Sequence, residues 1–279
     1  MTPWNRQRRR WVAVAAAMLA GGLVPRVRAQ AQGPGLVEVG EGGFRFLPGN
    51  PVFAVGAAAL PGFAVVHAVL DRWLPLDEGY ARVESHLAAV GRPLRALCGM
   101  ELRLPRQLSL EEFQAFNGPY VERLIRWGVL VDGRNPVSRT NVAPVVEPPE
   151  TPSLHAFSYT VPVPAGTGGF VMSGVTENGP AGVVAAGDTS SAGMLAKAEY
   201  LVPAVSQRLA RLGASFRTAT HVEIYSAMPV DGEGAARLLP AFDLGVRRGV
   251  RWHCGRPPVT GLELELEARR VVSEIVVET

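Results

Sequence analysis

The sequence matches itself at an offset of 122 residues, and this internal repeat limits what the chain can fold into more than any other feature. Residues 83–102 align with residues 205–224 without a gap, and six of these twenty positions are identical. The identical pairs are Val83 and Val205, Leu87 and Leu209, Ala88 and Ala210, Gly91 and Gly213, Arg95 and Arg217, and Glu101 and Glu223. Because repeated fold units leave self-similarity at a fixed period, we expect two copies of one unit.

Each copy has the pattern of a helix followed by a strand. Apolar residues recur at helical spacing over residues 80–90 and 194–212, and a glycine, Gly91 or Gly213, follows each helix. The alternating runs over residues 98–104 and 220–224 then predict half-buried strands. An apolar segment that ends in glycine, at residues 51–56 and 169–174, predicts a strand before each helix.

A second helix and further strands complete each copy. Ser109 and Glu112 predict a capping box at the start of a helix in the first copy, and a weaker helix is predicted over residues 234–244 in the second. Extended segments are predicted over residues 138–142, 154–161, 262–268 and 271–277. The proline-rich stretch 144–152 predicts a rim loop, because proline cannot donate into a central ladder. We therefore predict two domains, 32–162 and 163–279.

The first 31 residues have the pattern of a signal peptide. A basic block around Arg8, Arg9 and Arg10 precedes an apolar run over residues 12–24, and small residues surround a predicted cleavage after Ala29 or Ala31. Paired arginines before a modest apolar run are typical of the twin-arginine class. About thirteen residues reach only ~20 Å of a ~30 Å hydrocarbon core, so no stable membrane span is expected. The sequence predicts an exported, periplasmic protein.

The positive charge of the chain belongs to this leader. Six of its 28 basic residues lie in the first 29 residues, so the formal charge changes from +3 to −3 without them. The remaining chain carries no basic stripe that could neutralise phosphates. A nucleic-acid partner is therefore not expected.

Several kinds of chemistry find no support in the sequence. His, Cys and acidic residues do not occur at metal-ligand spacing, and the motifs of serine hydrolases and nucleotide-binding loops are absent, so we expect no metal and no cofactor. A disulfide between Cys98 and Cys254 stays open. Lys197 is the only lysine and hence the only candidate for a Schiff base, but its place beside an apolar stripe predicts a solvated rim residue.

The order of motifs in the two copies resembles the Rid (YjgF) family of enamine and imine deaminases. Residues 116–120 (FNGPY) look like the family's F-N-x-x-Y helix, and residues 136–140 (PVSRT) are similar to its P-x-R-[ST] motif. The second copy carries the family's central stretch at residues 170–174 (FVMSG), followed by residues 187–188 (GD) and 212–215 (LGAS). The resemblance implies an α+β fold with two tandem Rid/chorismate-mutase-like domains, each a mixed sheet covered on one face by two helices.

The resemblance also implies a site for a small enamine or imine that carries a carboxylate. Arg139 matches the family's carboxylate-binding arginine, whose planar fork suits that task. Glu265 or Glu267 matches the carboxylate that positions water, and Asn117, Tyr120 and Ser173 are expected to bind substrate. Blander interpretations stay open. Arg139 could be a surface arginine, and Asn117 and Tyr120 could cap a helix instead of lining the pocket. Residues 263, 265 and 267 could form a solvated sheet face.

Each copy carries only half of this site. The first copy has no acid in the run that corresponds to Glu265 and offers only His155 or Ser158, while the second lacks the arginine motif. Other arginines lie nearby in the second copy: Arg248, Arg251 and Arg256. Three functions therefore stay open. They are hydrolytic deamination of a 2-amino-muconate-like or 2-aminoacrylate-like compound, non-catalytic binding of a small metabolite, and a chorismatase-like hydrolysis.

The resemblance implies assembly as well. Members of the family bury the face of the sheet that lacks helices by closing three domains around an axis, and soluble proteins seldom leave such apolar surface exposed. We therefore expect the protein to form a homotrimer. Its expected ligand is a small carboxylated substrate.

Overall fold

The computed structural model describes residues 35–164, 168–228, 231–243 and 248–279. The predicted signal peptide, residues 1–31, lies outside the described residues. Residues Leu36–Thr279 form one compact unit, and the boundaries at 32–162 and 163–279 stay a prediction. Among the described helices, none combines the length and apolar character needed to cross a membrane.

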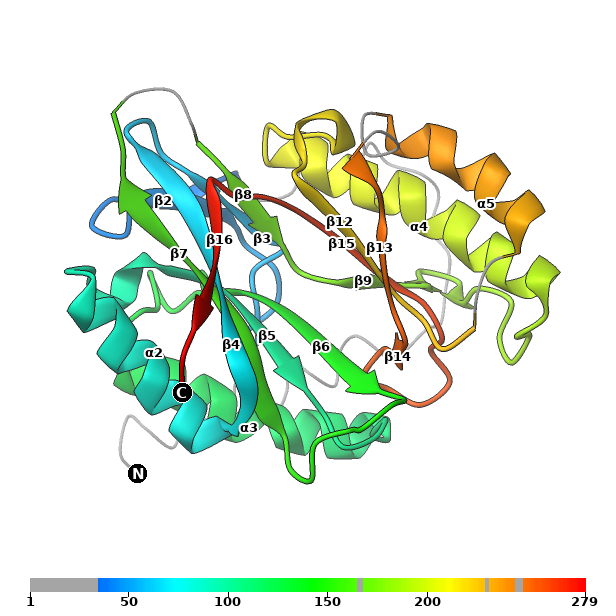
Figure 1. The fold of residues 1–279 in the computed structure, drawn as a ribbon, viewed down its shortest axis with the longest axis horizontal. Coiled ribbons are helices and arrows are strands. Elements are labelled where there is room, and N and C mark those ends of the chain that lie inside the picture. Colours follow the sequence, from blue (N-terminus) through cyan, green and yellow to red (C-terminus); the bar gives the residue numbers. More distant parts are fainter. Residues whose placement is uncertain (1–34, 165–167, 229–230, 244–247) are drawn as a thin grey trace, which may run out of the picture. The chain divides into compact units, whose positions relative to one another are not determined.

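One of the two large sheets has six strands in the order β14-β6-β5-β7-β4-β16 (Figure 1). Its strands are β4 (Phe63–Pro75), β5 (Leu97–Arg103), β6 (Ser138–Pro144), β7 (Ser153–Pro162), β14 (Gly255–Arg256) and β16 (Ser273–Val277). The sheet is mixed, because β5 runs parallel to β6 and β4 parallel to β16, while the other pairs are antiparallel. The proline-rich stretch forms the loop between β6 and β7, as predicted.

Helices α2 (Leu76–Ala89) and α3 (Leu110–Arg126) cover one face of this sheet. Their buried side chains, among them Val83, Leu87 and Leu124, pack against Met100 and Phe157 of the sheet. The predicted stop at Gly91 is confirmed by its φ of 66°, and the predicted capping box is present at the start of α3. A short 3₁₀ turn, η1 (Leu94–Ala96), leads into β5.

The other large sheet has the order β1-β2-β3-β8-β15-β12-β13, with β9 also paired to β15. Its strands are β1 (Val37–Val39), β2 (Phe44–Leu47), β3 (Gly56–Ala59), β8 (Phe170–Met172), β9 (Val175–Thr176), β12 (His221–Tyr225), β13 (Arg251–His253) and β15 (Glu265–Arg270). Only β12 and β13 run parallel. A separate small hairpin joins β10 (Asn178–Gly179) to β11 (Gly182–Val183).

Helix α4 (Ser191–Arg211) and the shorter α5 (Gly232–Leu238) cover this second sheet. The predicted apolar stripe of α4 is confirmed, since Met194, Leu201, Val205 and Leu209 are buried against residues such as Leu266. The 3₁₀ turns η2 (Phe216–Thr218) and η3 (Leu239–Phe242) follow these helices. A helix was predicted over residues 234–244, but α5 ends at Leu238. The residues that follow, Leu239–Phe242, form the 3₁₀ turn η3. The predicted fold class, α+β with two mixed sheets each covered by two helices, is confirmed.

The two sheets exchange strands between the halves of the sequence and meet through the faces that lack helices. Strands β1, β2 and β3 precede residue 60 but join β8, whereas β14 and β16 follow residue 254 but join the six-stranded sheet. Phe44, Phe46 and Val171 of one sheet pack against Val65 and Cys98 of the other. We call this contact between the two sheets the seam.

Two local predictions differ from the structure or are settled by it. Residues 51–55 do not form the predicted strand, because Pro51 lacks an amide proton and the Asn50 side chain accepts from the amides of Val52 and Phe53 at 2.8 and 3.0 Å. The strand begins only at Gly56. Cys98 is buried and Cys254 exposed, and both are free.

Candidate functional site

Arg139 lies on β6 beneath helix α3, with its side chain almost completely buried. Its Nη2 donates to Oδ1 of Asn117 at 2.6 Å. The side-chain amide of Asn141 is oriented with its oxygen toward Arg139. This oxygen accepts from Nη2 and from Nε of Arg139, each at 3.1 Å. Two residues of the predicted site, Arg139 and Asn117, are thus in direct contact. The interpretation of Arg139 as a solvated surface residue is wrong.

Four aromatic rings surround the Arg139 guanidinium. Its Cζ lies 4.5 Å from the ring centre of Tyr120, and 5.6, 5.7 and 5.9 Å from those of Phe53, Phe113 and Phe116. Ring faces attract a cation at these distances, so the cage fixes the plane of the guanidinium. Tyr120, a predicted site residue, is part of this cage, and burial raises the pKa of Tyr120 to about 12.

One donor of the guanidinium remains unused. Nη1 of Arg139 is buried and has no hydrogen-bond partner among the described residues. Burial lowers the pKa of Arg139, while the nearby Tyr120, Tyr80 and Glu265 raise it. Because an unpaired buried donor is costly, a fixed cation with a spare N–H group suits an anionic ligand such as a carboxylate.

Ser173 connects the second half of the chain to the backbone at Arg139. Its hydroxyl accepts from the amide of Arg139 at 2.9 Å and donates to the carbonyl of Ala54 at 2.6 Å. The side chain is completely buried. Ser173 therefore lies next to Arg139, but it contacts the backbone there, and its role in substrate binding stays a prediction.

Glu265, the first residue of β15, is buried on the face of the strand that points to the seam. Oε2 of Glu265 has no hydrogen-bond partner among the described residues. Gly174 leaves room for this carboxyl group, since a Cβ atom at position 174 would lie 1.6 Å from Oε1. Burial raises the pKa of Glu265 well above its ordinary value and Glu267 raises it further, whereas Arg103 and Arg139 lower it. Of these charges, that of Arg139, in the other half of the chain, has the smallest effect on the pKa of Glu265.

The neighbouring Glu267 is buried too, so the alternative of a solvated sheet face is wrong for both glutamates. The Thr140 hydroxyl donates to Oε2 of Glu267 and accepts from the amide of Gly174. Burial, together with the charge of Glu101, raises the pKa of Glu267 to about 8. Glu263, the third acid of the alternating run, pairs instead with Arg256 at 3.1 Å.

A larger group of charges fills the middle of the seam, and sequence reasoning missed it. Arg269 is its centre and lies 3.1 Å from Glu101, 2.9 Å from Glu223 and 2.7 Å from Glu267. Glu101 and Glu223 occupy equivalent positions of the internal repeat, so their identity was the signal in the sequence. Burial would raise the pKa of Glu101, but Arg269, His67 and Arg103 lower it below its ordinary value.

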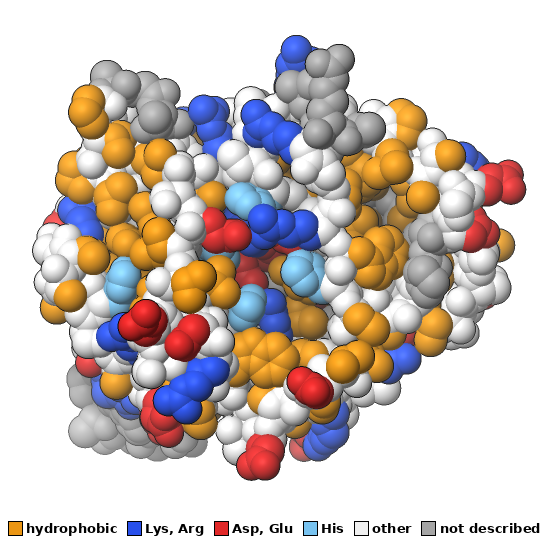
Figure 2. Space-filling view, in the orientation of Figure 1, with side chains coloured by type: hydrophobic (Ala, Val, Ile, Leu, Met, Phe, Trp, Pro, Cys, Tyr) orange, Lys and Arg blue, Asp and Glu red, His pale blue; other side chains and the backbone are white. Residues whose placement is uncertain are grey.

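Four of the five histidines of the chain belong to this seam cluster. Figure 2 shows histidine, acidic and basic side chains together where the middle of this face is hollowed. His67 and His155 lie 3.4 and 4.0 Å from Glu101, while His253 lies 2.6 Å from Glu223 and His221 lies 3.5 Å from Glu274. Burial, followed by the charge of Arg269, lowers the pKa of His67 to about 4.

The two polar substitutes considered for the first copy, His155 and Ser158, both lie in the seam cluster. Nδ1 of His155 accepts from the indole of Trp73 at 3.1 Å, and the Ser158 hydroxyl is 2.9 Å from Nδ1 of His67. Of the alternative arginines of the second copy, Arg251 belongs to the cluster through Glu274 at 3.3 Å. Arg248 donates to the carbonyl of Ala219 at 2.5 Å.

The prediction that Lys197 lies at a solvated rim is wrong. Its side chain is completely buried, and Nζ donates to the carbonyls of Val184 and Ala185, each at 2.8 Å. Oε1 of Glu177 lies 3.7 Å away. An ammonium group that is held by two carbonyls and an acid is poorly suited to Schiff-base chemistry. Among the described residues, no group of three or more His, Cys, Asp and Glu is arranged to hold a metal ion.

Comparison with known proteins places this chain among deaminases. The family model of the 2-aminomuconate deaminase CnbZ matches residues 36–275. The chain belongs to this family. It is also 37% identical, over 251 residues, to a 2-amino-5-chloromuconate deaminase from Comamonas testosteroni, with 87% of this chain and 99% of the relative covered. The expected relation to deaminases is thus confirmed as membership of a 2-aminomuconate deaminase family.

Solved structures give weaker likenesses. A chorismatase structure matches 77% of this chain and 77% of its own with a TM-score of 0.45 and 13% identity. A YjgF-family protein from Mycobacterium tuberculosis matches 37% of this chain and 79% of its own with a TM-score of 0.28 and 17% identity. A Rid-family protein from Yersinia pestis matches 40% of this chain and 84% of its own with a TM-score of 0.29 and 14% identity.

Proposed function

We propose that this protein hydrolytically deaminates a small carboxylated enamine or imine of the 2-aminomuconate type. Its family and its relative from Comamonas testosteroni support this reaction class. The observation that carries the proposal is a pair of buried side chains, each of which has a polar atom without a hydrogen-bond partner among the described residues. Nη1 of Arg139 has no partner among the described residues, and Glu265, whose Oε2 is also unpaired, is within range of its charge.

In this proposal Arg139 binds a carboxylate of the substrate. Asn117, Asn141 and the aromatic cage hold the guanidinium in one plane, so little conformational entropy is lost when the carboxylate binds. Nη1 supplies the free donor. The substrate would then extend from Arg139, beneath α3, toward Glu265 on the seam face of β15, with its amino-bearing carbon at Glu265.

Glu265 then acts as an acid and a base in turn. Burial raises its pKa and favours the protonated form, so it can protonate the enamine carbon and leave an iminium ion. The resulting carboxylate takes a proton from the water that attacks the iminium carbon, which gives a carbinolamine. Glu265 next protonates the nitrogen, the C–N bond breaks to release ammonia, and the hydroxyl proton returns to Glu265. The net reaction consumes one water and yields a ketone and ammonia.

Ammonia release from freshly generated 2-aminomuconate and other 2-enamino acids tests this function. Arg139→Lys keeps the charge but loses the planar fork, and we expect kcat/KM to fall about 30- to several-thousand-fold. Lysine is preferred to alanine because Arg139 is buried and its removal would also leave a cavity. Glu265→Gln should lower kcat more than it weakens binding. Arg126→Lys, an exposed position at the end of α3, is the matched control.

Three outcomes distinguish the candidate functions. Wild-type activity of Arg139→Lys would overturn the assignment of the carboxylate site. Saturable binding of the enamino acid without ammonia release would favour a non-catalytic binding protein, which is the alternative that the division of the site between the two halves supports. Pyruvate release from chorismate would instead indicate a chorismatase-like hydrolase.

We further propose that the protein is exported to the periplasm by the twin-arginine route. The support is the order of basic, apolar and small-residue blocks, and the family match begins only at residue 36. The intact mass of protein from the periplasmic fraction should correspond to cleavage after Ala29 or Ala31. Replacing Arg8, Arg9 and Arg10 by lysine should block export. Full-length protein retained in washed membranes would contradict the proposal.

A further inference from the structure

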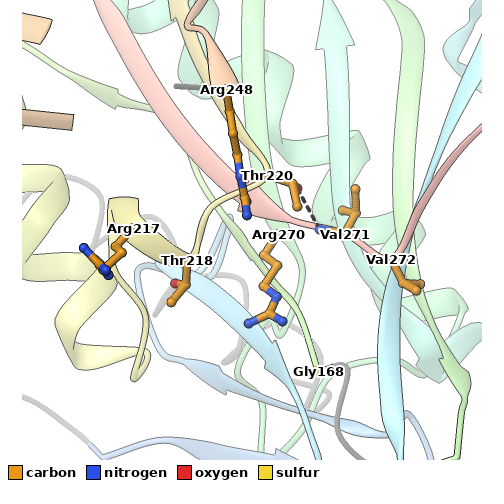
Figure 3. Close-up of a pocket in the computed structure, with 8 residues that line it drawn as sticks. All are labelled: Gly168, Arg217, Thr218, Thr220, Arg248, Arg270, Val271 and Val272. Carbon is orange, nitrogen blue, oxygen red and sulfur yellow. Dashed lines mark hydrogen bonds between the residues drawn. The ribbon is translucent and has the colours of Figure 1, made fainter. Parts of the chain in front are cut away.

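A pocket that the proposed reaction does not use lies where the chain passes from one sheet to the other. It has a volume of about 330 Å³, within the range of about 300–1,000 Å³ that is common for small-molecule sites. Its lining comes from η2 and the residues after it, from Arg248, and from the link between β15 and β16 (Figure 3). The lining residues are Gly168, Arg217, Thr218, Thr220, Arg248, Arg270, Val271 and Val272.

The charge of this pocket is entirely positive. Three of its lining residues are arginines and none is acidic. Arg217 turns to the side and lies 3.5 Å from Asp243, whereas Arg248 extends toward Thr220 and Arg270 (Figure 3). The side chain of Arg270 makes no hydrogen bond or ion pair with a described residue, and the sequence has no Asp or Glu in segments 165–167 and 244–247. Two guanidinium groups therefore face one space without a carboxylate between them.

The two arginines are held in place by their backbones and neighbours. Nη1 of Arg248 donates to the carbonyl of Ala219 at 2.5 Å, which leaves its other N–H groups for a ligand. Arg270 is the last residue of β15 and pairs with Phe170 of β8. The next residue, Val271, donates from its amide to Thr220 at 3.0 Å, and Val272 donates to the carbonyl of Val65 at 2.8 Å. The pocket wall is thus tied to both sheets.

The geometry points to a binding site for a small dianion, held by Arg270 and Arg248 and separate from Arg139. Guanidinium groups bind carboxylates and phosphates through charge-assisted, often paired hydrogen bonds. A dicarboxylate and a phosphate share this chemistry, and both would bridge the segment after η2 and the link between the sheets. Without its first 29 residues the chain is formally acidic, so the positive charge here is local and attracts anions specifically to this pocket. This site is independent of the proposed deamination.

Calorimetric titration of the protein with inorganic phosphate and with muconate, a dicarboxylate without an amino group, tests the site. We expect at least one of the two to bind, and Arg270→Gln to weaken this binding about 10- to 100-fold because one charged partner is lost. Arg248→Gln should act in the same direction. Arg126→Gln removes an exposed arginine elsewhere and should leave binding unchanged. Arg139→Lys should also retain it, since the two sites are separate.

The outcomes also identify the ligand class. Muconate binding that Arg270→Gln weakens and Arg139→Lys leaves unchanged assigns the pocket to dicarboxylates. Phosphate binding with the same response assigns it to phosphate or phosphorylated compounds. Arg270→Gln should keep the deaminase activity measured without added anion, so failure of the dianion site and failure of the proposed function are distinguishable. The inference is overturned if neither anion binds, if binding survives in both Arg270→Gln and Arg248→Gln, or if Arg139→Lys abolishes it.

Discussion

At the scale of single residues, a buried carboxyl group that holds its proton to a higher pH than an ordinary glutamate is the centre of the proposed reaction. Burial raises the pKa of Glu265 well above its ordinary value. Between the pKa of the unfolded chain and that of the folded protein, the folded state therefore binds more protons. Its free energy of unfolding must fall as the pH rises through this interval, and the loss is complete only above the folded pKa.

Glu265→Gln removes this titration, and we expect the variant to gain stability relative to the wild type as the pH rises from 5 to 8. Urea denaturation of both proteins at pH 5, 6.5 and 8 measures the difference in free energy of unfolding. A difference that stays constant with pH, or that changes in the opposite direction, would contradict a raised pKa at Glu265. The same series separates a proton-holding residue from one that merely fills space, because only the former gives a pH-dependent difference.

The sequence identified Arg139, Asn117 and Tyr120 because they belong to local motifs on one helix and one strand. It could not identify Phe53 or Asn141, since their contact with the guanidinium depends on how a loop and a neighbouring strand position pack. Most of the seam cluster was missed for the same reason. Its members, such as His67 and Arg269, lie on different strands whose pairing no local pattern reveals.

At the scale of elements, the buried lysine of α4 fixes the start of the strand that carries Glu265. Lys197 lies 3.7 Å from Glu177, whose carboxylate in turn accepts from the amides of Glu263 and Leu264 at 2.6 and 3.3 Å. These two residues directly precede β15. The position of the catalytic candidate therefore depends on an ion pair between a helix and the segment after β9.

Lys197→Met should destabilise the protein by about 3–5 kcal/mol, because it leaves Glu177 buried without its cation and two carbonyls without a donor. Adding Glu177→Gln should recover part of this loss. The control is Glu199→Gln, also on α4, which breaks an exposed ion pair with Arg237 of α5 and should cost about 0–1 kcal/mol. Urea denaturation measures all three variants. A loss for Lys197→Met no larger than that of the control would contradict the role of the buried pair.

Helices were the most predictable elements, because the apolar stripes of α2 and α4 and the capping box of α3 are encoded locally. Strands were predictable in position but not in partner. The extended segment predicted over residues 271–277 contains strand β16, yet only the folded chain shows that β16 leaves β15 and runs parallel to β4. Lys197 was mispredicted because its partners, two backbone carbonyls, leave no mark on the sequence.

At the scale of the whole molecule, the resemblance to the Rid family implied two units with bare sheet faces, and this was the reason to expect a homotrimer. In the structure these two faces already cover one another at the seam, through an apolar cluster and the charges around Arg269. What remains uncovered is the outer part of the seam beside the edge strand β16. There Val272 and Val276 are 48% and 71% exposed.

We predict that these two valines lie in the contact between chains of a homotrimer. A three-fold ring places one surface of each chain against a different surface of the next, and apolar residues on an unpaired edge strand are suited to such a contact.

Light scattering of the purified protein should give about three times the mass of one chain. Val276→Lys should shift this mass toward the monomer, because it places a charge in an apolar contact. Val146→Lys, at a loop position that is 65% exposed, should leave the assembly unchanged. A wild-type protein that is monomeric at all concentrations would contradict the homotrimer, and a trimer that survives Val276→Lys would move the contact away from β16.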